Sequence, residues 1–282
     1  MSIDKITGIA LGDLNNISGR SSNGISSFSG VTWPTSSSGH VTSGLMLFID
    51  GGNSSSYPGT GTTAYDLTSN NYDGTLLNNV AYDSSGYFDF DGNDDRINFG
   101  TLSDFNFSID DSFTMEVWYK TDSENEYQIF LSRMAASAPY EGWEFALGPS
   151  YDRNEIALAM RSGIPNPTNG KIQSSYSTNG NFNKNTWYQA AVVYDGATSA
   201  HPSSATYYQN GYALNTAVAL NDSFSGSDLD ISMDMEIGAR PTLNPAGAFH
   251  KNIAIVRIYD RALSATEVQT NYDNDKSTFG LS

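Results

Sequence analysis

Acidic side chains are the residues of this chain whose type and spacing could do chemistry. In the run at 229–238, Asp230, Asp234 and Glu236 alternate with apolar residues, so their carboxyl groups share one strand face. Two carboxyl groups about 5 Å apart can hydrolyse a glycosidic bond with retention. A solvated strand face carries the same pattern with no catalytic role. Glu116 stands alone in its own run, and we predict no catalytic residue and no enzyme.

Composition argues against several other kinds of reactive site. The chain has no cysteine, so neither disulfides nor cysteine-based zinc sites can form. Its three histidines, His40, His201 and His250, show no i, i+4 spacing. There is no Gly-x-Ser-x-Gly elbow and no phosphate-binding loop. The sequence therefore predicts a protein that requires no cofactor.

Calcium remains a candidate ligand, because a formal charge of −17 leaves many carboxylates available. The loop that contains Asp66 and Asp73 fits either a capped loop or a structural calcium site, and both alternatives stay open. The run at 91–95 begins like an EF-hand loop. However, Arg96 and Leu102 stand where that loop requires glycine and glutamate. Asp-Gly-Asn favours turns, so a hairpin turn is predicted there.

Short alternating strands must position these side chains. Charged residues make up only 16% of the chain and glycines number 26, a mixture typical of many strands joined by tight turns. In 113–120, Phe113, Met115, Val117 and Tyr119 share one face. Further strands are predicted at 44–51, 87–100, 186–196, 205–214, 229–238 and 253–258. Antiparallel strands of this number and length predict an all-β, two-sheet sandwich.

One short helix is predicted near the C-terminus. Ser264 is the N-cap residue and Glu267 completes a capping box, while Leu263 and Val268 occupy the hydrophobic staple positions. The helix is expected over about Ala265–Tyr272, and it can cover one end of the sandwich.

The first 31 residues contain a repeat. The pattern apolar-x-x-apolar-(Ser/Thr)-Gly occurs three times at a spacing of eleven residues. Such a unit is too short to bury its own apolar pair, so the arm either packs on its own domain or docks onto another subunit. We favour docking, through Ile3, Ile6, Leu14, Ile17, Ile25 and Phe28. The predicted organisation is an arm at 1–31, a linker at 32–43, a sandwich at 44–275 and a tail at 276–282.

Several motifs resemble the laminin-G-like branch of the concanavalin A-like lectin/glucanase superfamily. They are FTMEVWYK, NTWYQAAVVYDG, MEIGARP and AFHKNIAIVRIYDRALSATEVQTNYD, and with the opening GLMLFIDGG they span about 44–275 in order. The resemblance implies a jelly-roll sandwich of two antiparallel sheets, one of them concave. The terminal strand would close one sheet, and the helix would cover the edge of that sheet.

The same resemblance bears on catalysis and on calcium. Glucanases of this superfamily carry a Glu-x-Asp-x-x-Glu strand, and the nearest run here, from Asp228 to Glu236, lacks both glutamates at the required places. Relatives often hold a structural calcium with an aspartate in the last strand. Ala254 occupies that position in this chain.

Sugar binding is the other function that the resemblance implies. Such sites pair a flat aromatic ring with a few amides or carboxylates. Trp118 and Trp187 fall within strands and are predicted to be core, and any single aromatic residue has packing as its alternative role. The candidates in predicted loops are Tyr57, Tyr140, Trp143, Tyr151 and Tyr176.

The segment GGNSSSYPGTGTTAYDL and the Lys276-x-x-Phe279-Gly280 tail resemble versions found in virion proteins of tailed bacteriophages. We therefore expect a head decoration or a tail or fibre component on the particle surface. It would be held in a symmetric array through the arm, with a host-surface glycan as a candidate partner. The acidic charge argues against nucleic acid and membrane partners. The alternative is a bacterial carbohydrate-binding module or adhesin, for which an export signal is expected, and the N-terminus does not resemble one.

Overall fold

The computed structural model describes residues 39–123, 126–135, 140–148, 155–161, 172–178, 180, 182–197, 202–221, 232–240 and 247–282, together with four two-residue strands nearer the N-terminus. The chain divides into two units, Met1–His40 and Val41–Ser282. Within the described residues, no helix is long and apolar enough to cross a membrane.

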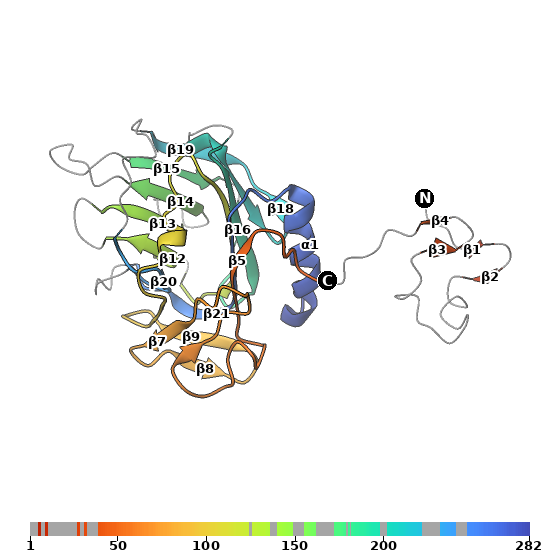
Figure 1. Cartoon of the computed structure of the whole chain (residues 1–282), viewed down its shortest axis with the longest axis horizontal. Helices are drawn as coiled ribbons and strands as arrows, with labels where there is room; N and C mark the ends of the chain where they lie inside the picture. The colour runs from red at the N-terminus through yellow and green to blue at the C-terminus, as the bar shows by residue number, and fades with distance from the viewer. Residues whose placement is uncertain are drawn as a thin grey trace. The chain divides into compact units, whose positions relative to one another are not determined.

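Two antiparallel sheets form the larger unit, as the sequence predicts (Figure 1). The first sheet has nine strands. In spatial order they are β19 (Thr216–Asn221), β15 (Ile172–Ser177), β14 (Ile156–Arg161), β13 (Gly142–Leu147), β12 (Gln128–Met134), β20 (Glu236–Ile237), β10 (Arg96–Asn98), β7 (Gly74–Leu77) and β6 (Thr63–Ala64).

The second sheet has eight strands, and the long strand β21 (His250–Tyr259) organises it. One side of β21 pairs with β11 (Ser112–Lys120), while its other side pairs first with β9 (Tyr87–Asp91) and then with β5 (Leu45–Asp50). The remaining strands of this sheet are β16 (Tyr188–Asp195), β17 (Ala205–Gln209) and β18 (Tyr212–Ala213), which follow β11 in that order, and β8 (Ala81–Asp83), which pairs with β9.

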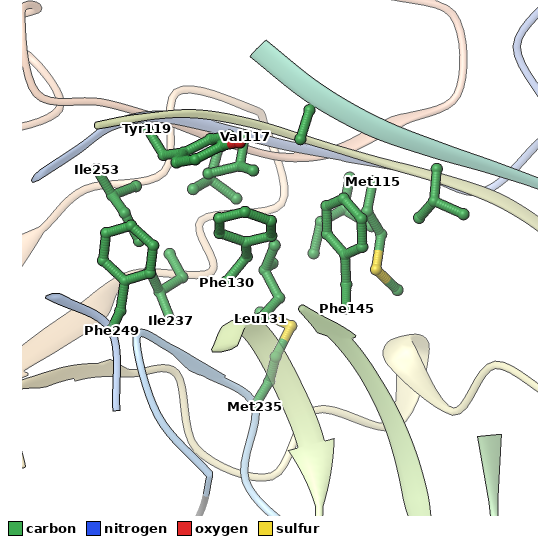
Figure 2. Close-up of a cluster of buried hydrophobic side chains, with 14 of the residues drawn as sticks. Met115, Val117, Tyr119, Phe130, Leu131, Phe145, Met235, Ile237, Phe249 and Ile253 are labelled. Carbon is green, nitrogen blue, oxygen red and sulfur yellow. The ribbon is translucent and has the colours of Figure 1, made fainter. Parts of the chain in front are cut away.

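The core lies between the two sheets, and Figure 2 shows its centre. Side chains of β11 point toward those of β12 and β13, where Phe130 lies 4.6 Å from Tyr119 and 5.2 Å from Phe145, measured between ring centroids. The predicted alternation in β11 is confirmed, because Phe113, Met115 and Val117 are fully buried in this core. Tyr119 completes the set.

Strand β21 departs from simple alternation. Its pairing with β11 shifts register, so Trp118 lies opposite Ile255 and Tyr119 lies opposite Ile253. The residue skipped is Ala254, and the bulge moves the next residues to the opposite faces. Ile253 and Val256 therefore both belong to the central core. The predicted two-residue period of 253–258 is wrong at this point.

The predicted hairpin at 87–100 is also wrong. Strand β9 belongs to the eight-stranded sheet and β10 to the nine-stranded sheet, so residues 92–95 connect the two layers. By contrast, Asn210-Gly211, a dipeptide typical of two-residue hairpin turns, does form a hairpin. Strands β17 and β18 pair across it, and both turn residues have positive φ angles of 52° and 78°.

Helix α1 (Ala265–Asp275) begins with the predicted capping box. The Ser264 side chain accepts a hydrogen bond from the Glu267 backbone, and the Glu267 side chain accepts one from the Ser264 backbone. The helix runs three residues beyond the prediction and continues into a 3₁₀ turn, η6 (Lys276–Phe279). The segment at 276–282 thus begins with ordered structure.

Helix α1 lies on the outer face of the eight-stranded sheet (Figure 1). We call this the covered face and define it by Glu116, Trp118 and Arg257. Trp118 is fully buried because Tyr272 and Phe279 stack on it, with ring centroids 5.7 Å and 4.2 Å away. This apolar contact removes the indole from water and fixes the helix.

Polar contacts also hold the helix to the covered face. Arg257 makes two hydrogen bonds to Asp275, at 2.6 Å and 3.1 Å. Glu116 accepts hydrogen bonds from Asn271 at 2.6 Å and from Gln189. Burial raises the pKa of Glu116 to about 7, although the Arg257 charge opposes this shift.

The arm contains two small strand pairs. Ile6 pairs with Ile9 and Phe28 pairs with Val31, so two of the predicted anchor residues lie in short strands. The other four, Ile3, Leu14, Ile17 and Ile25, lie outside the described residues. The four strands are β1 (Lys5–Ile6), β2 (Ile9–Ala10), β3 (Ser27–Phe28) and β4 (Val31–Thr32).

Candidate functional site

The outer face of the nine-stranded sheet carries a row of polar side chains. In the register of β20, β12 and β13, Glu236 lies opposite Ser132, which lies opposite Glu144. Their sequence neighbours Ile237, Leu131 and Phe145 belong to the core, so the three polar side chains point to the other face. All three are almost completely buried. We call this row and its partners the polar face.

The prediction of an acidic, water-exposed face at 229–238 is therefore wrong for Glu236, which is 2% exposed. Arg96 donates a hydrogen bond to it at 3.1 Å, and the Asn98 amide donates a second at 2.7 Å. Burial raises the pKa of Glu236, while these donors oppose the shift. Asp234 accepts hydrogen bonds from Asn98 and Thr101. In this half of the polar face, the carboxylates of Glu236 and Asp234 therefore have hydrogen-bond donors from neighbouring side chains.

Glu144 is the centre of the other half. Its two carboxylate oxygens accept hydrogen bonds from Arg240 at 2.5 Å and 2.9 Å, a bidentate ion pair. Ser132 donates a weaker hydrogen bond to the same carboxylate at 3.3 Å. Burial lowers the pKa of Arg240, but the hydrogen-bonded Glu144 more than compensates, and the pKa of Arg240 is raised.

Two tyrosine rings border this ion pair. The Arg240 guanidinium lies 5.7 Å from the ring centroid of Tyr127 and 5.7 Å from that of Tyr140. A second guanidinium, that of Arg161 at the end of β14, lies 5.4 Å from the Tyr140 ring. All four side chains are partly exposed, so solvent reaches them. Tyr140, Arg161 and Arg240 thus form a mixed aromatic and cationic cluster beside Glu144.

The backbone at Tyr140 is unusual, because its φ angle is +58°. A bulky side chain in this left-handed region costs about 1–2 kcal/mol relative to the ordinary helical conformation. Strain of this kind is typical of functional sites, where surrounding contacts hold a side chain in one place. The two arginines lie over the ring of this residue.

The structure separates the aromatic residues that the sequence grouped as glycan-binding candidates. Trp143 is fully buried and donates a hydrogen bond to the Phe105 carbonyl, and Tyr57 is 5% exposed and packs on Tyr82. Neither ring has a free face for a sugar, which corrects the candidate set. Tyr140 lies in the cluster, and Tyr176 is half-buried in β15. Tyr151 lies outside the described residues.

The Asp66 carboxylate is already used within its loop. Its oxygens accept hydrogen bonds from the backbone of Phe48, Thr68 and Tyr72, and Asp73 accepts one from the Asp66 backbone. This pattern favours the capped loop over the calcium site predicted at Asp66 and Asp73.

Acidic side chains gather instead in the connection between the two sheets. Carboxylate oxygens of Asp91, Asp94 and Asp95 lie within 4.8 Å of one another. Asp95 is 4% exposed, and its Oδ1 atom has no hydrogen-bond partner among the described residues. Hard cations take such oxygen ligands. These three residues, rather than Asp66 and Asp73, could hold a structural cation.

Sequence reasoning missed Arg161, Arg240, Glu144 and Tyr127. Glu144 and Arg240 stand 96 residues apart, so no local pattern joins them. A usable signal was the single charge in each of the apolar strands that carry Glu144 and Arg161, because a charge on a largely buried strand requires a partner.

Fold and site together define a lectin-like sandwich of two antiparallel sheets with a polar, partly aromatic outer face. The family model described as the concanavalin A-like lectin/glucanases superfamily matches residues 91–269. This match covers more than half of the chain, and the chain belongs to that superfamily. No curated protein sequence matches the chain.

Solved structures with a similar fold include enzymes and toxin domains. The Trypanosoma rangeli sialidase in complex with sialic acid is 14% identical with a TM-score of 0.58, and the match covers 84% of this chain and 34% of that one. The binding domain of Paraclostridial Mosquitocidal Protein 1 is 16% identical with a TM-score of 0.54, covering 84% and 55%.

The botulinum neurotoxin serotype G binding domain is 18% identical with a TM-score of 0.52, covering 83% of this chain and 51% of that one. The chain thus spans between a third and about half of the length of these proteins. At such identities the likeness shows the fold alone.

Proposed function

We propose that this chain is a non-enzymatic virion protein of a tailed bacteriophage. Its sandwich displays the polar face toward a host-surface glycan, and its N-terminal arm attaches it to the particle. The observation that carries the glycan-binding part is the cluster of Tyr140, Arg161 and Arg240 beside Glu144. Sugar rings stack on aromatic side chains, and their hydroxyl groups take both donors and acceptors. The cluster offers an aromatic ring and guanidinium donors in one place.

The state of the two buried glutamates supports a non-enzymatic role. Glu144 and Glu236 lie two strands apart, so their backbones are roughly 10 Å apart. Retaining and inverting hydrolysis need the two carboxyl groups roughly 5 Å and roughly 6.5–9.5 Å apart, so these side chains would have to lean toward each other. Moreover, arginines bind both carboxylates. Arg240 uses both oxygens of Glu144, and Arg96 and Asn98 hold Glu236 at its Oε1 atom.

The organisation of the chain supports arm-mediated attachment. Residues Met1–His40 form a unit separate from the sandwich, and they contain the three apolar repeats. Identical subunits around a particle would give such an arm many equal docking surfaces. The same sandwich would also serve a bacterial carbohydrate-binding module, which remains the alternative, but a particle-docking arm has no role there.

Glycan binding is tested by screening the full chain on a glycan array beside Tyr140→Leu and Tyr212→Leu variants. Tyr212 is 69% exposed on β18 of the other sheet and serves as the matched aromatic control. We expect binding by the wild type and by Tyr212→Leu, with at least a tenfold loss for Tyr140→Leu. Equal binding by all three proteins would contradict a site at the polar face. Glycan hydrolysis by the wild type would contradict the non-enzymatic role.

Attachment is tested by comparing the full chain with a chain that starts at Gly39. This start keeps Val41, whose backbone bonds to Asn271 at 2.7 Å and to Tyr259 at 3.0 Å. We expect the shortened chain to stay folded and monomeric but to lose co-sedimentation with particles that lack the protein. Unchanged co-sedimentation would exclude the arm as the anchor and favour the alternative module.

A further inference from the structure

We infer that the polar face selects an acidic glycan and that Arg161 binds a carboxylate group of this ligand. The inference rests on the proposed glycan-binding function and names the chemical class of the sugar. It is carried by the number of charges in the cluster, by the contacts of Arg161, and by the chemistry of the guanidinium group.

The cluster has more positive than negative charge. Among the described residues, the charged and titratable groups that act on Arg161 are Arg240, Glu144 and Tyr140. Glu144 already forms a bidentate pair with Arg240, and both of its oxygens are used. Two guanidinium groups therefore share one carboxylate, in a chain whose formal charge is −17.

Arg161 stands apart from the other arginines in the described part of the chain. Arg96, Arg240, Arg257 and Arg261 each donate hydrogen bonds to a carboxylate, and Arg133 donates to backbone carbonyls. For Arg161, the described contact of the guanidinium is the face of the Tyr140 ring. Its Nε atom is buried and has no acceptor among the described residues.

An unpaired, half-buried guanidinium is costly unless an anion completes it. Burial lowers the pKa of Arg161, and the neighbouring Arg240 charge lowers it further. However, an arginine does not lose its proton in a protein, so the shift cannot remove the charge. The described residues offer no acceptor for the Arg161 Nε atom, and we assign that role to a bound ligand. The planar fork of the guanidinium matches a carboxylate in a bidentate geometry.

The position of Arg161 beside an aromatic ring indicates that this acceptor belongs to a sugar. Its guanidinium and that of Arg240 both lie within 6 Å of the Tyr140 ring centroid, so a ring stacked there would place a substituent within reach of both. An acidic sugar supplies the stacking ring and the carboxylate in one molecule.

The experiment measures binding of the full chain to matched pairs of oligosaccharides. One pair is an oligogalacturonate and its methyl ester, and the other is a sialylated oligosaccharide and its desialylated form. A sulfated form of the same core distinguishes a carboxylate from any anion. The variants are Arg161→Met, Arg161→Lys and the charge-matched control Lys276→Gln, in which the altered residue pairs with Asp273 near the end of α1.

We expect the wild type to bind the acidic member of at least one pair at least tenfold more tightly than its neutral counterpart. The preference should weaken as salt is raised from 50 to 500 mM, because screening reduces the attraction. Arg161→Met should abolish the preference, Arg161→Lys should restore part of it, and Lys276→Gln should retain it. A folded Arg161→Met that keeps its circular dichroism spectrum excludes unfolding as the cause.

Three outcomes would overturn the inference and are distinguishable. Equal binding to the acidic and neutral members would remove the acidic selectivity and leave glycan binding at the polar face intact. No binding to any glycan would remove both the inference and the proposed function. Tighter binding of the sulfated form than of the carboxylate would reject the carboxylate assignment.

Discussion

Buried charge clusters on the two outer faces of the sandwich have excess charge of opposite sign. On the covered face, one arginine, Arg257, meets two carboxylates, those of Glu116 and Asp275. At the Glu144 end of the polar face, two arginines, Arg161 and Arg240, lie near one carboxylate, that of Glu144. The first cluster has an excess negative charge and the second an excess positive charge.

The difference between the faces follows from which groups can lose their charge. A buried carboxylate can lose its charge by taking up a proton. Burial favours this form of Glu116, because it raises the pKa of that carboxyl group to about 7. A guanidinium has no such choice, because arginine stays protonated. On the covered face the Arg257 guanidinium forms an ion pair with Asp275 once α1 is in place, although its buried Nε has no acceptor among the described residues. At the Glu144 end of the polar face, Arg161 has no acceptor for its Nε among the described residues, and we propose that an added anion supplies one. We therefore assign binding to this face and structure to the other.

The largest expected effect on stability comes from removing the arginine that binds a buried carboxylate on each face, Arg257 or Arg240. Arg257→Leu leaves Glu116 and Asp275 buried without their cation, and we expect it to lower the free energy of unfolding by about 3–5 kcal/mol. Arg240→Leu, at a site that is 14% exposed, should cost less because water can solvate the remaining Glu144 more readily. Urea unfolding of both variants checks this. Equal losses would contradict the distinction between the two faces.

The second prediction concerns pH. Because the folded pKa of Glu116, about 7, exceeds its ordinary value of 4.5, folding takes up a proton here. The stability that this proton provides is complete below pH 4.5 and is lost as pH rises through 7. In Glu116→Gln the decline between pH 4.5 and 7 should be shallower, by at most about one proton taken up on folding.

Unfolding free energies measured across this window test the assignment. The comparison uses the difference in slope between wild type and Glu116→Gln. A constant cost of the substitution cancels in that difference, as do other titrating groups such as Glu236, whose pKa is also raised. Parallel curves for the two proteins would show that folding does not change the protonation of Glu116 in this window, which would remove the charge argument for the covered face.

Local pattern predicted the elements more fully than the site. The alternation of Phe113, Met115 and Val117 and the capping box at Ser264 follow from neighbours in sequence, and the structure confirms them. Contacts between distant residues could not be predicted in this way. Glu116 meets Asn271 across 155 positions, and the bulge at Ala254 depends on pairing with β11.

The connection at 92–95 is another feature that local sequence pattern did not predict. Alternating residues around an Asp-Gly-Asn turn fit a hairpin, yet the two strands enter different sheets. Sequence periodicity reports which face a side chain occupies, and it does not report which sheet a strand joins. Asp95 is buried because it lies at this crossing between the layers.

That crossing supports the third prediction, which carries the smallest expected effect. Asp91, Asp94 and Asp95 bring three carboxylates together at the junction of the two sheets, and the Oδ1 atom of Asp95 has no partner among the described residues. We expect millimolar calcium to raise the unfolding temperature of the wild type by a few degrees and EDTA to reverse this. Asp95→Asn should abolish the response, whereas Asp73→Asn should retain it because Asp73 serves its own loop. If Asp73→Asn abolishes the response and Asp95→Asn does not, the cation belongs to the first loop and the junction is held by protein contacts alone.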